Sequence, residues 1–251
     1  MRKMYLIVWI ALVLLGCKTS LNVADFKAEN QTNYQNISTT DSSLVRFIEP
    51  YREQVDREML EVIAETPVDL VKRKPESLLT NYLADILLTE GQLYAAKMTP
   101  KPIPQVAYQN YGGIRADIPK GKITVGKIFE VMPFENEMVL LQVKGNDLWA
   151  LGEMVARKGG DSVAGMRLRI ANGQLLSMEI GQMPLNKQAE YWLVTNDYVA
   201  NGGDDMTMLR NRLVRINTGI RLRDCFIEHM RNNYNAGNVI SPKLDGRISN
   251  E

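Results

Sequence analysis

The sequence is poor in histidine and cysteine, and it has no excess of charge of either sign. His229 is the only imidazole in 251 residues. A histidine-rich dinuclear metal centre therefore cannot be built from this sequence, and a Ser-His-Asp or Cys-His pair would have to use His229 itself. Thirty basic residues face twenty-nine acidic ones, which argues against a nucleic-acid-coating protein or a polyanion binder. There is also no Walker loop and no G-x-G-x-x-G opening a helix.

The N-terminus has the pattern of an export signal. Arg2 and Lys3 precede an apolar stretch, residues 4–15, which is too short to span a bilayer comfortably and ends in Leu14-Leu15-Gly16-Cys17. This order resembles the lipobox of bacterial lipoproteins, and it predicts a signal peptide over residues 1–16 and lipidation of Cys17. The alternative is a plain signal peptide followed by an incidental cysteine. Lipidation would make the chain an exported, membrane-anchored bacterial lipoprotein on the periplasmic or cell-surface side. Cys225 would then have no disulfide partner.

The rest of the chain divides into a tether and one domain. Residues 17–43 are rich in Asn, Thr, Ser and Gln and read as a flexible, lipid-anchored tether. From residue 44 to residue 251, helical and strand patterns alternate, which predicts a single α/β domain. Helices are expected over about 44–65, 76–88, 148–156 and 220–234, and strands over 68–71, 105–109, 138–143, 163–170, 174–180 and 191–198. Pro50 should kink the first helix or mark its true start, and Gly91 should lie just beyond the second. Residues 128–132 are expected to form a short apolar turn, and Asn172-Gly173 a hairpin turn.

His229 follows Cys225 by four residues on the last predicted helix, so the two side chains share a face. That spacing permits a metal site or a thiol-imidazole pair. The competing interpretation is structural, because Leu222, Phe226 and Met230 complete an apolar stripe around them. The structural interpretation is the favoured one.

The strand at 105–109 leads into the segment Asn110-Tyr111-Gly112-Gly113-Ile114-Arg115. Two glycines allow a sharp turn and a close approach of the backbone to a ligand. The guanidinium of Arg115 offers a planar fork to a phosphate or a ribose oxygen. Taken alone, the segment is a weak indication of a site, and a surface turn is the favoured explanation.

Three further segments carry chemistry of the same kind. Phe134 follows a proline and serves either as core or as a ring presented to a flat ligand. Tyr198 follows a strand, and the turn Gly202-Gly203 after it ends in Asp204, which is placed to accept hydrogen bonds from vicinal hydroxyls or serves only as a turn carboxylate. The basic run at residues 72–74 precedes a helix N-terminus, where an anion is favoured.

In this order, the segments resemble the C-terminal domain of the 5′-nucleotidase family. The sequences NYGGIR at 110–115, PFEN at 133–136 and YVANGGD at 198–204 are similar to the family patterns N-x-G-G-I-R, P-F-x-N and aromatic-x-A-x-G-G-D. ESLLTNYLAD at 76–85 is similar to the family helix E-x-x-x-G-N-x-x-A-D, with Thr80 where glycine is usual. The resemblance extends from about residue 44 to the C-terminus. It implies an α+β fold of layered mixed sheets with flanking helices.

The resemblance also implies a site that stacks a nucleobase between two aromatic rings, with no catalytic residue in this domain. Matched residue by residue, Asn110 would read the base edge, Gly113 would bring the backbone close, and Arg115 would face ribose or phosphate. Arg73 is a looser match, since the basic run could be aligned one residue either way. The remaining matches are the two rings and the ribose carboxylate: Phe134, Tyr198 and Asp204.

In the family, an N-terminal metallophosphoesterase domain holds the two catalytic metals with Asp, His and Asn ligands. We expect this sequence to lack that domain, because residues 17–43 read as a tether. We therefore expect the chain to bind no cofactor or metal itself and to be inactive alone. One hypothesis is the recognition part of a split nucleotidase, for nucleotide catabolism and phosphate-ester hydrolysis, with the divalent metals on a separate metallophosphoesterase chain. A second is a non-enzymatic nucleotide- or nucleoside-binding lipoprotein, and a third is an interaction module with a decayed site.

Overall fold

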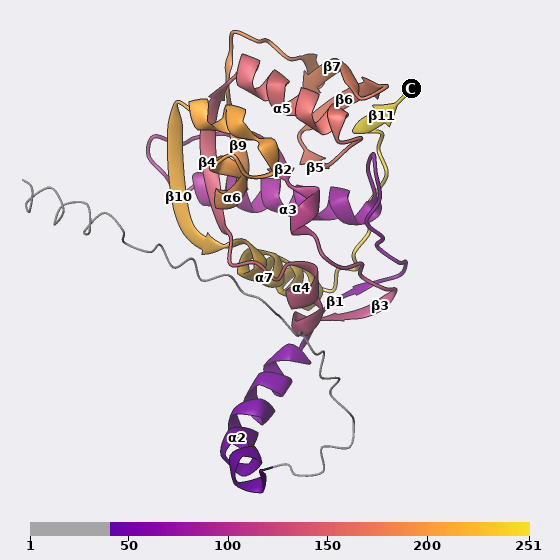
Figure 1. The fold of residues 1–251 in the computed structure, drawn as a ribbon, viewed down its shortest axis with the longest axis vertical. Coiled ribbons are helices and arrows are strands. Elements are labelled where there is room, and N and C mark those ends of the chain that lie inside the picture. The colour runs from indigo at the N-terminus through magenta and orange to yellow at the C-terminus, as the bar shows by residue number, and fades with distance from the viewer. Residues whose placement is uncertain (1–40) are drawn as a thin grey trace, which may run out of the picture. The chain divides into compact units, whose positions relative to one another are not determined.

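The structure is a computed structural model that describes residues 41–251 (Figure 1). The predicted signal peptide, the lipidation site Cys17 and nearly all of the predicted tether lie outside these residues. The chain divides into two units, residues 1–48 and 49–251. Along residues 41–251, no helix combines the length and apolar character needed to cross a membrane.

The first described helix is shorter than the sequence predicts. Helix α2 spans Ser42–Met59 and contains Pro50, which therefore does not mark its start. The prediction that it continues to about residue 65 is wrong, because Val62–Thr66 form strand β1. This strand pairs antiparallel with β3 (Gly121–Thr124). Ile63 is fully buried, so this segment belongs to the core.

A five-stranded mixed sheet forms the centre of residues 49–251. Its strand order is β10-β4-β9-β2-β5, and only the β2–β9 pair is parallel. The strands are β2 (Pro104–Gln109), β4 (Glu137–Lys144), β5 (Ser162–Ala164), β9 (Glu190–Asn196) and β10 (Val214–Arg221). A second sheet has the order β11-β6-β7-β8. Its strands are β6 (Met166–Ala171), β7 (Gln174–Ile180), β8 (Met183–Pro184) and β11 (Ile248–Asn250).

Alternating side chains of the central sheet point to opposite faces and pack into two separate hydrophobic cores. On β4, Leu140 joins one hydrophobic cluster, whereas Val139 and Leu141 join the other, as the two-residue period of a strand requires. Helices α3 (Leu78–Ala95), α4 (Val125–Val131) and α7 (Leu222–Asn235) cover the first face. Helix α5 (Gly145–Arg157) and the second sheet cover the other (Figure 1). The result is the layered mixed α/β fold that the sequence predicts.

Helix α3 begins as its sequence indicates but ends later. The Ser77 hydroxyl accepts a hydrogen bond from the Thr80 backbone N–H at 3.2 Å, and the Thr80 hydroxyl accepts one from the Ser77 N–H at 2.9 Å. Such reciprocal capping fixes a helix start. The helix then runs through Gly91, which was expected to lie beyond it. Gly91 is buried at the contact with β9, where a Cβ atom would come within 2.4 Å of a Val194 methyl carbon.

Other differences lie in short or irregular elements. The apolar segment expected to be a turn at 128–132 is mostly helix α4, capped by Thr124. The strand expected at 191–198 ends at Asn196, which caps the short helix α6 (Asp197–Ala200). The strand expected at 68–71 is reduced to a single bridge between Leu70 and Ile118. The hairpin turn at Asn172-Gly173 is present, with positive φ angles of 50° and 74° as a type I′ turn requires.

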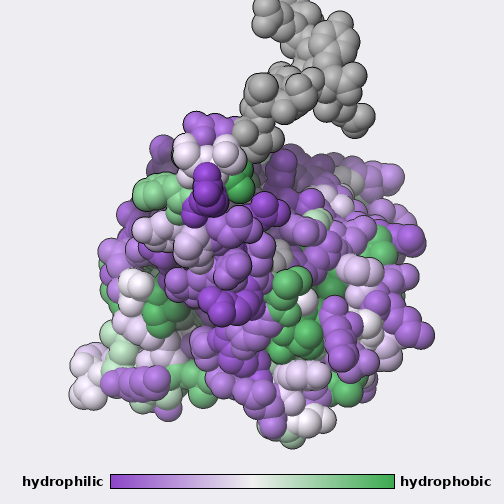
Figure 2. All heavy atoms as spheres, turned by 90° about the horizontal axis from the view of Figure 1, so that it is seen from below, coloured by the Kyte–Doolittle hydropathy of each residue, from purple (hydrophilic) through white to green (hydrophobic). Residues whose placement is uncertain are grey.

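Exposed apolar side chains gather on helix α2, where Leu44, Phe47 and Val55 are more than half exposed. The face drawn in Figure 2 is mostly hydrophilic, and its hydrophobic side chains form small, separated groups. Single exposed apolar side chains such as Ile103, Leu213 and Leu244 are ordinary on folded proteins.

Candidate functional site

Three loops meet at one edge of the central sheet. β2 and β9 are parallel neighbours, so their carboxyl ends lie together, and β4 is antiparallel to β9, so its amino end lies at the same edge. The loops after β2, before β4 and after β9 line a cavity of about 310 Å³. Its lining residues are Asn110, Gly112, Gly113, Arg115, Phe134, Asn136, Tyr198 and Asp204. Six of the seven binding residues predicted from the sequence are in this set.

The turn after β2 depends on its glycines. Gly113 is buried, and a Cβ atom there would lie 2.7 Å from Gln109 Nε2 and 2.9 Å from Asn110 Oδ1. A Cβ on Gly112 would lie 3.2 Å from Asp204 Oδ2. A side chain at Gly113 would therefore displace the buried amides, which is why the turn needs glycine at that position.

Buried amide side chains join the first and third loops. Asn110 Oδ1 accepts hydrogen bonds from Asn196 Nδ2 at 3.0 Å and from Gln109 Nε2 at 3.3 Å. Asn196 Oδ1 in turn accepts from the Val199 N–H at 2.8 Å and caps α6. All three amides are buried and mutually hydrogen-bonded, as buried polar groups must be.

Asp204 lies where the first and third loops touch. Its backbone is left-handed, with φ 51° and ψ 38°, after Gly202 at φ 90°. Asn110 Nδ2 donates to Oδ2 of Asp204 at 2.7 Å, and the Tyr198 hydroxyl donates to Oδ1 at 3.0 Å. The Lys158 ammonium donates to the Asp204 carbonyl. The carboxylate next to the Tyr198 hydroxyl raises the pKa of Tyr198.

Two aromatic rings line the cavity and remain partly open to solvent. Phe134 is 44% exposed and Tyr198 is 46% exposed, so neither ring is part of the core. The guanidinium of Arg115 lies 6.0 Å from the centre of the Phe134 ring. Exposed rings beside polar groups in a cavity offer stacking surfaces to a flat ligand.

Two contacts hold the segment that follows Phe134. The buried guanidinium of Arg223 pairs with Glu135 and packs 3.9 Å from the ring of Phe129. The Glu137 N–H donates to Asp197 Oδ1 at 3.0 Å. Because Asp197 precedes Tyr198, this bond ties the two ring-bearing loops to each other.

Asp161 holds the turn after β2 in place through hydrogen bonds of its buried carboxylate, and the sequence analysis did not identify it. Its Oδ1 accepts the Tyr111 N–H at 2.5 Å, and its Oδ2 accepts the Tyr108 hydroxyl at 2.8 Å. Burial raises the pKa of Asp161 to about 6, and burial together with the Asp161 charge raises the pKa of Tyr108. The sequence does contain one indication of Asp161: residues 159–161 repeat the Gly-Gly-Asp sequence found at 202–204.

Arg73 is the predicted binding residue that does not line this cavity. It is exposed and borders a different hollow, with Asp69, Glu76 and Leu244. Its neighbours Lys72 and Lys74 instead place their ammonium groups 3.8 Å and 4.9 Å from the centre of the Tyr111 ring.

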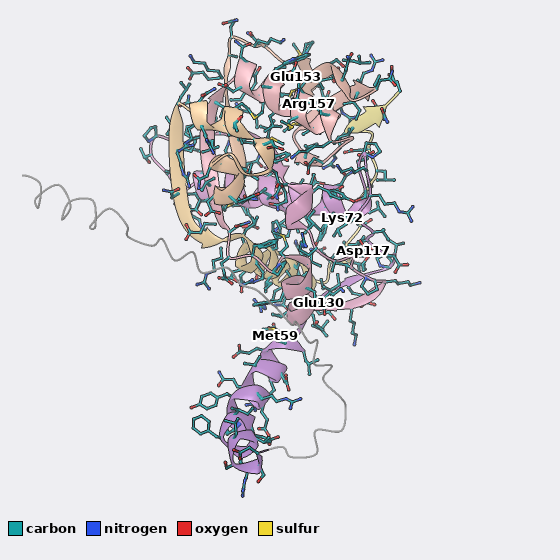
Figure 3. All side chains as sticks on the ribbon, viewed as in Figure 1. Met59, Lys72, Asp117, Glu130, Glu153 and Arg157 are labelled. Atoms are coloured by element: carbon teal, nitrogen blue, oxygen red, sulfur yellow. The ribbon has the colours of Figure 1, made fainter. Side chains whose placement is uncertain are left out.

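Lys72 is bound to the Gly-Gly-Ile-Arg turn. Its ammonium donates to the Ile114 carbonyl at 2.6 Å, and its backbone N–H donates to Asp117 Oδ1 at 2.8 Å (Figure 3). Burial and, secondly, the charge of Arg115 lower the pKa of Lys72. Lys72 therefore holds the turn that carries Arg115, although it does not itself line the cavity.

His229 and Cys225 have structural surroundings. The Nδ1 atom of His229 lies 2.6 Å from Glu90 Oε1 and links α7 to α3. Cys225 is buried, and burial raises the pKa of its thiol to about 12, so the thiol stays protonated. Within residues 41–251, no three His, Cys, Asp or Glu side chains gather as metal ligands would. These residues do not fit a dinuclear metal centre.

The fold is a layered α/β domain, and its cavity presents two open aromatic rings beside a carboxylate and an arginine. The family described as 5′-nucleotidase, C-terminal domain, matches residues 62–211. The chain therefore belongs to the 5′-nucleotidase family through its C-terminal domain.

Named relatives agree with this assignment. The chain is 29% identical to the trifunctional nucleotide phosphoesterase protein YfkN of Bacillus subtilis over 70% of its own length, and 27% identical to a 5′-nucleotidase of Vibrio vulnificus over 71%. It covers 12% and 32% of those proteins. The crystal structure of a 5′-nucleotidase precursor from Thermus thermophilus aligns with a TM-score of 0.70 and 32% identity. That alignment covers 84% of this chain and 43% of the other.

Proposed function

We propose that this chain is the nucleotide- and nucleoside-recognition module of a 5′-nucleotidase-type system that hydrolyses phosphate esters in nucleotide catabolism. The observation that carries the proposal is the assembly of Asn110, Arg115, Phe134, Tyr198 and Asp204 around one cavity. The assignment to the family and the named nucleotide phosphoesterases support it. The base would stack on Phe134 and Tyr198, and such stacking contributes about 1–3 kcal/mol per base.

The hydrogen bonds of Asn110 limit how it would read a base. Its carbonyl oxygen already accepts two hydrogen bonds, from Asn196 and Gln109. One of its two N–H groups is used by Asp204. A side-chain amide has two donors, so one N–H remains for a ligand. Asn110 would therefore donate to an acceptor atom on the base edge.

The cations near the cavity suit the phosphate side of a nucleotide. Arg115 lines the cavity, and the Lys72 ammonium is bound to the carbonyl of the preceding residue, Ile114, outside the lining. An arginine fork and a nearby ammonium both favour a phosphate oxygen. Arg73 would contribute only if its exposed side chain reached across from its own hollow.

We propose that catalysis requires divalent metals held by a separate metallophosphoesterase chain, and that this chain binds no cofactor itself. The single imidazole of the sequence supports this, because the metal centre of the family uses histidine ligands. We further propose that Cys17 is lipidated and anchors the chain, so that recognition occurs at a membrane surface in an exported compartment.

The test is a calorimetric titration of the purified chain with adenosine and AMP, each with and without added divalent cations, while released phosphate is followed. We expect saturable binding of both ligands and no metal-dependent phosphate release. Release of phosphate that depends on added metal would contradict the split-enzyme part of the proposal. Absence of binding would contradict the recognition part and would favour an interaction module with a decayed site.

The alternative is a nucleotide-binding lipoprotein that captures or senses its ligand without an enzyme. It shares the cavity and differs in its partner. Affinity purification of the tagged chain from its own cells separates the two, because recovery of a metallophosphoesterase supports the split enzyme. A chain that binds adenosine and is recovered alone supports the alternative.

A further inference from the structure

The Tyr198 hydroxyl makes two hydrogen bonds with Asp204, one to its carboxylate and one from its backbone N–H. The hydroxyl donates to Asp204 Oδ1 at 3.0 Å and accepts the Asp204 backbone N–H at 3.3 Å. The other oxygen, Oδ2, accepts from Asn110 Nδ2 at 2.7 Å. Each carboxylate oxygen therefore already accepts one hydrogen bond from the protein.

The backbone keeps the Tyr198 hydroxyl beside Asp204. The Tyr198 ring lies flat against Gly203, where a Cβ atom would come within 2.4 Å of the ring. The left-handed conformation of Asp204 then folds its carboxylate back over the end of the ring. The turn thus wraps around the ring, and ring and carboxylate form one unit of the cavity wall.

We propose that the Tyr198 hydroxyl sets how strongly this site recognises the sugar of a nucleoside. It occupies the carboxylate oxygen that would otherwise accept a ribose hydroxyl, so the site depends mainly on the base and only weakly on the ribose. The inference rests on the proposed function, since it concerns the same cavity. It identifies Tyr198 as a specificity-determining residue through its hydroxyl, in addition to its ring.

The physical reason is competition for one acceptor. Hydrogen bonds to an ionised group are stronger than those between neutral groups. Breaking the hydrogen bond from Tyr198 to Asp204 therefore costs free energy. A ribose hydroxyl that approaches Oδ1 must either displace Tyr198 or share an oxygen whose charge is already partly neutralised. A phenylalanine ring keeps the stacking surface and removes the competitor.

The experiment compares adenosine with 2′,3′-dideoxyadenosine, which lacks both vicinal hydroxyls, by isothermal titration calorimetry. The measured quantity is the ratio of the Kd for dideoxyadenosine to the Kd for adenosine. In the wild type we expect a ratio close to one. In Tyr198→Phe we expect the ratio to rise about 3- to 10-fold, which corresponds to one recovered hydrogen bond. Circular dichroism melts of each variant confirm that it is folded.

Two further variants assign the effect to this pair of residues. Combining Tyr198→Phe with Asp204→Asn should abolish the rise, because the carboxylate that accepts the ribose hydroxyls is gone, while asparagine tolerates the left-handed backbone. Tyr94→Phe removes a tyrosine hydroxyl from a hollow that does not include Tyr198 or Asp204, and it should show the wild-type ratio.

A wild type that binds both nucleosides, with a ratio that Tyr198→Phe leaves unchanged, overturns this inference and leaves the proposed function standing. A rise that persists in the double variant also overturns it, because the gain would then not come from Asp204. A wild type that binds neither nucleoside overturns the proposed function and this inference together.

Discussion

At the scale of single residues, Asp161 positions the turn after β2 through its hydrogen bonds to Tyr108 and Tyr111. It accepts the N–H of Tyr111 and so holds the turn that carries Asn110 and both glycines. Its carboxyl is nearly inaccessible to water, and its pKa is raised to about 6 by burial. A buried carboxyl with this pKa ties the stability of the site to pH.

The stability contributed by Asp161 should fall as pH rises. In the unfolded chain this carboxyl titrates near its ordinary pKa of 3.8, and in the folded chain near 6. The folded state holds the proton more tightly, so the contribution is complete below pH 3.8 and is lost as pH rises through about 6. We expect the melting temperature of the wild type, relative to Asp161→Asn, to decrease over this range. A difference in melting temperature that does not change with pH would contradict the assignment.

A second prediction at this scale concerns the exposed ring of Phe134. Phe134→Ala should weaken the binding of adenosine about tenfold, because about 1–3 kcal/mol of stacking is lost. Calorimetry on the folded variant measures the change. Ile103→Ala is a matched control, since Ile103 is exposed but absent from the cavity. Equal affinities of Phe134→Ala and the control would refute a stacking role.

Residues within ordered motifs could be placed from the sequence, whereas supporting residues could not. Asn110, Arg115, Phe134, Tyr198 and Asp204 each stand in a short segment with a recognisable turn, and all five line one cavity. Asp161 acts through contacts with residues about 50 positions away. Its Gly-Gly-Asp sequence indicates a turn, but it does not show which distant groups the carboxylate accepts from. Arg73 was matched from a run of three cations. In the structure, Lys72 and Lys74 of that run face the Tyr111 ring, whereas Arg73 borders a different hollow.

At the scale of elements, α3 packs closely against β9, the strand whose carboxyl end leads into the third cavity loop. Gly91 lies inside α3, and its missing side chain lets the helix approach Val194 closely. Gly91 was expected to follow the helix, because glycine is typical of helix ends and close packing is not visible in sequence. Strand β1 and helix α4 were missed for a related reason: each has seven residues or fewer and takes its shape from its partners.

Gly91→Ala should therefore destabilise the domain although alanine favours helices. The added methyl group would overlap the Val194 side chain, and overpacking of this kind costs about 1–3 kcal/mol. Chemical denaturation measures the free energy of unfolding. Thr89→Ala, at a position of the same helix outside the core, should change it by less than about 0.5 kcal/mol. Unchanged or increased stability of Gly91→Ala would show that the contact is looser than described.

At the scale of the whole molecule, residues 49–251 enclose two hydrophobic cores on the two faces of one sheet. The single free cysteine of residues 41–251 is buried, so the fold is stabilised by packing without a disulfide in this part of the chain. The other cysteine, Cys17, precedes the described residues and is left for the proposed lipid.

Attachment to membranes should depend on Cys17 alone. In the bacterial cell, Cys17→Ser should lose fatty-acid labelling and move from the membrane fraction to the soluble fraction, because acyl chains provide the anchoring free energy. Cys225→Ala is the matched control, since it removes the other thiol, and it should remain in the membrane fraction. Retention of Cys17→Ser in membranes would indicate a different mode of attachment.

The bond between Asn110 and Asp204 joins positions 94 residues apart and exists only when β2 and β9 lie side by side. The unfolded chain therefore has no assembled site for a nucleoside. A nucleoside that binds only the folded chain lowers the fraction of unfolded molecules. At a hundred times its Kd, a ligand shifts that equilibrium by about 2.7 kcal/mol. If the proposed export and nucleoside binding hold, the resistance of the protein to proteolysis should rise with the concentration of its ligand.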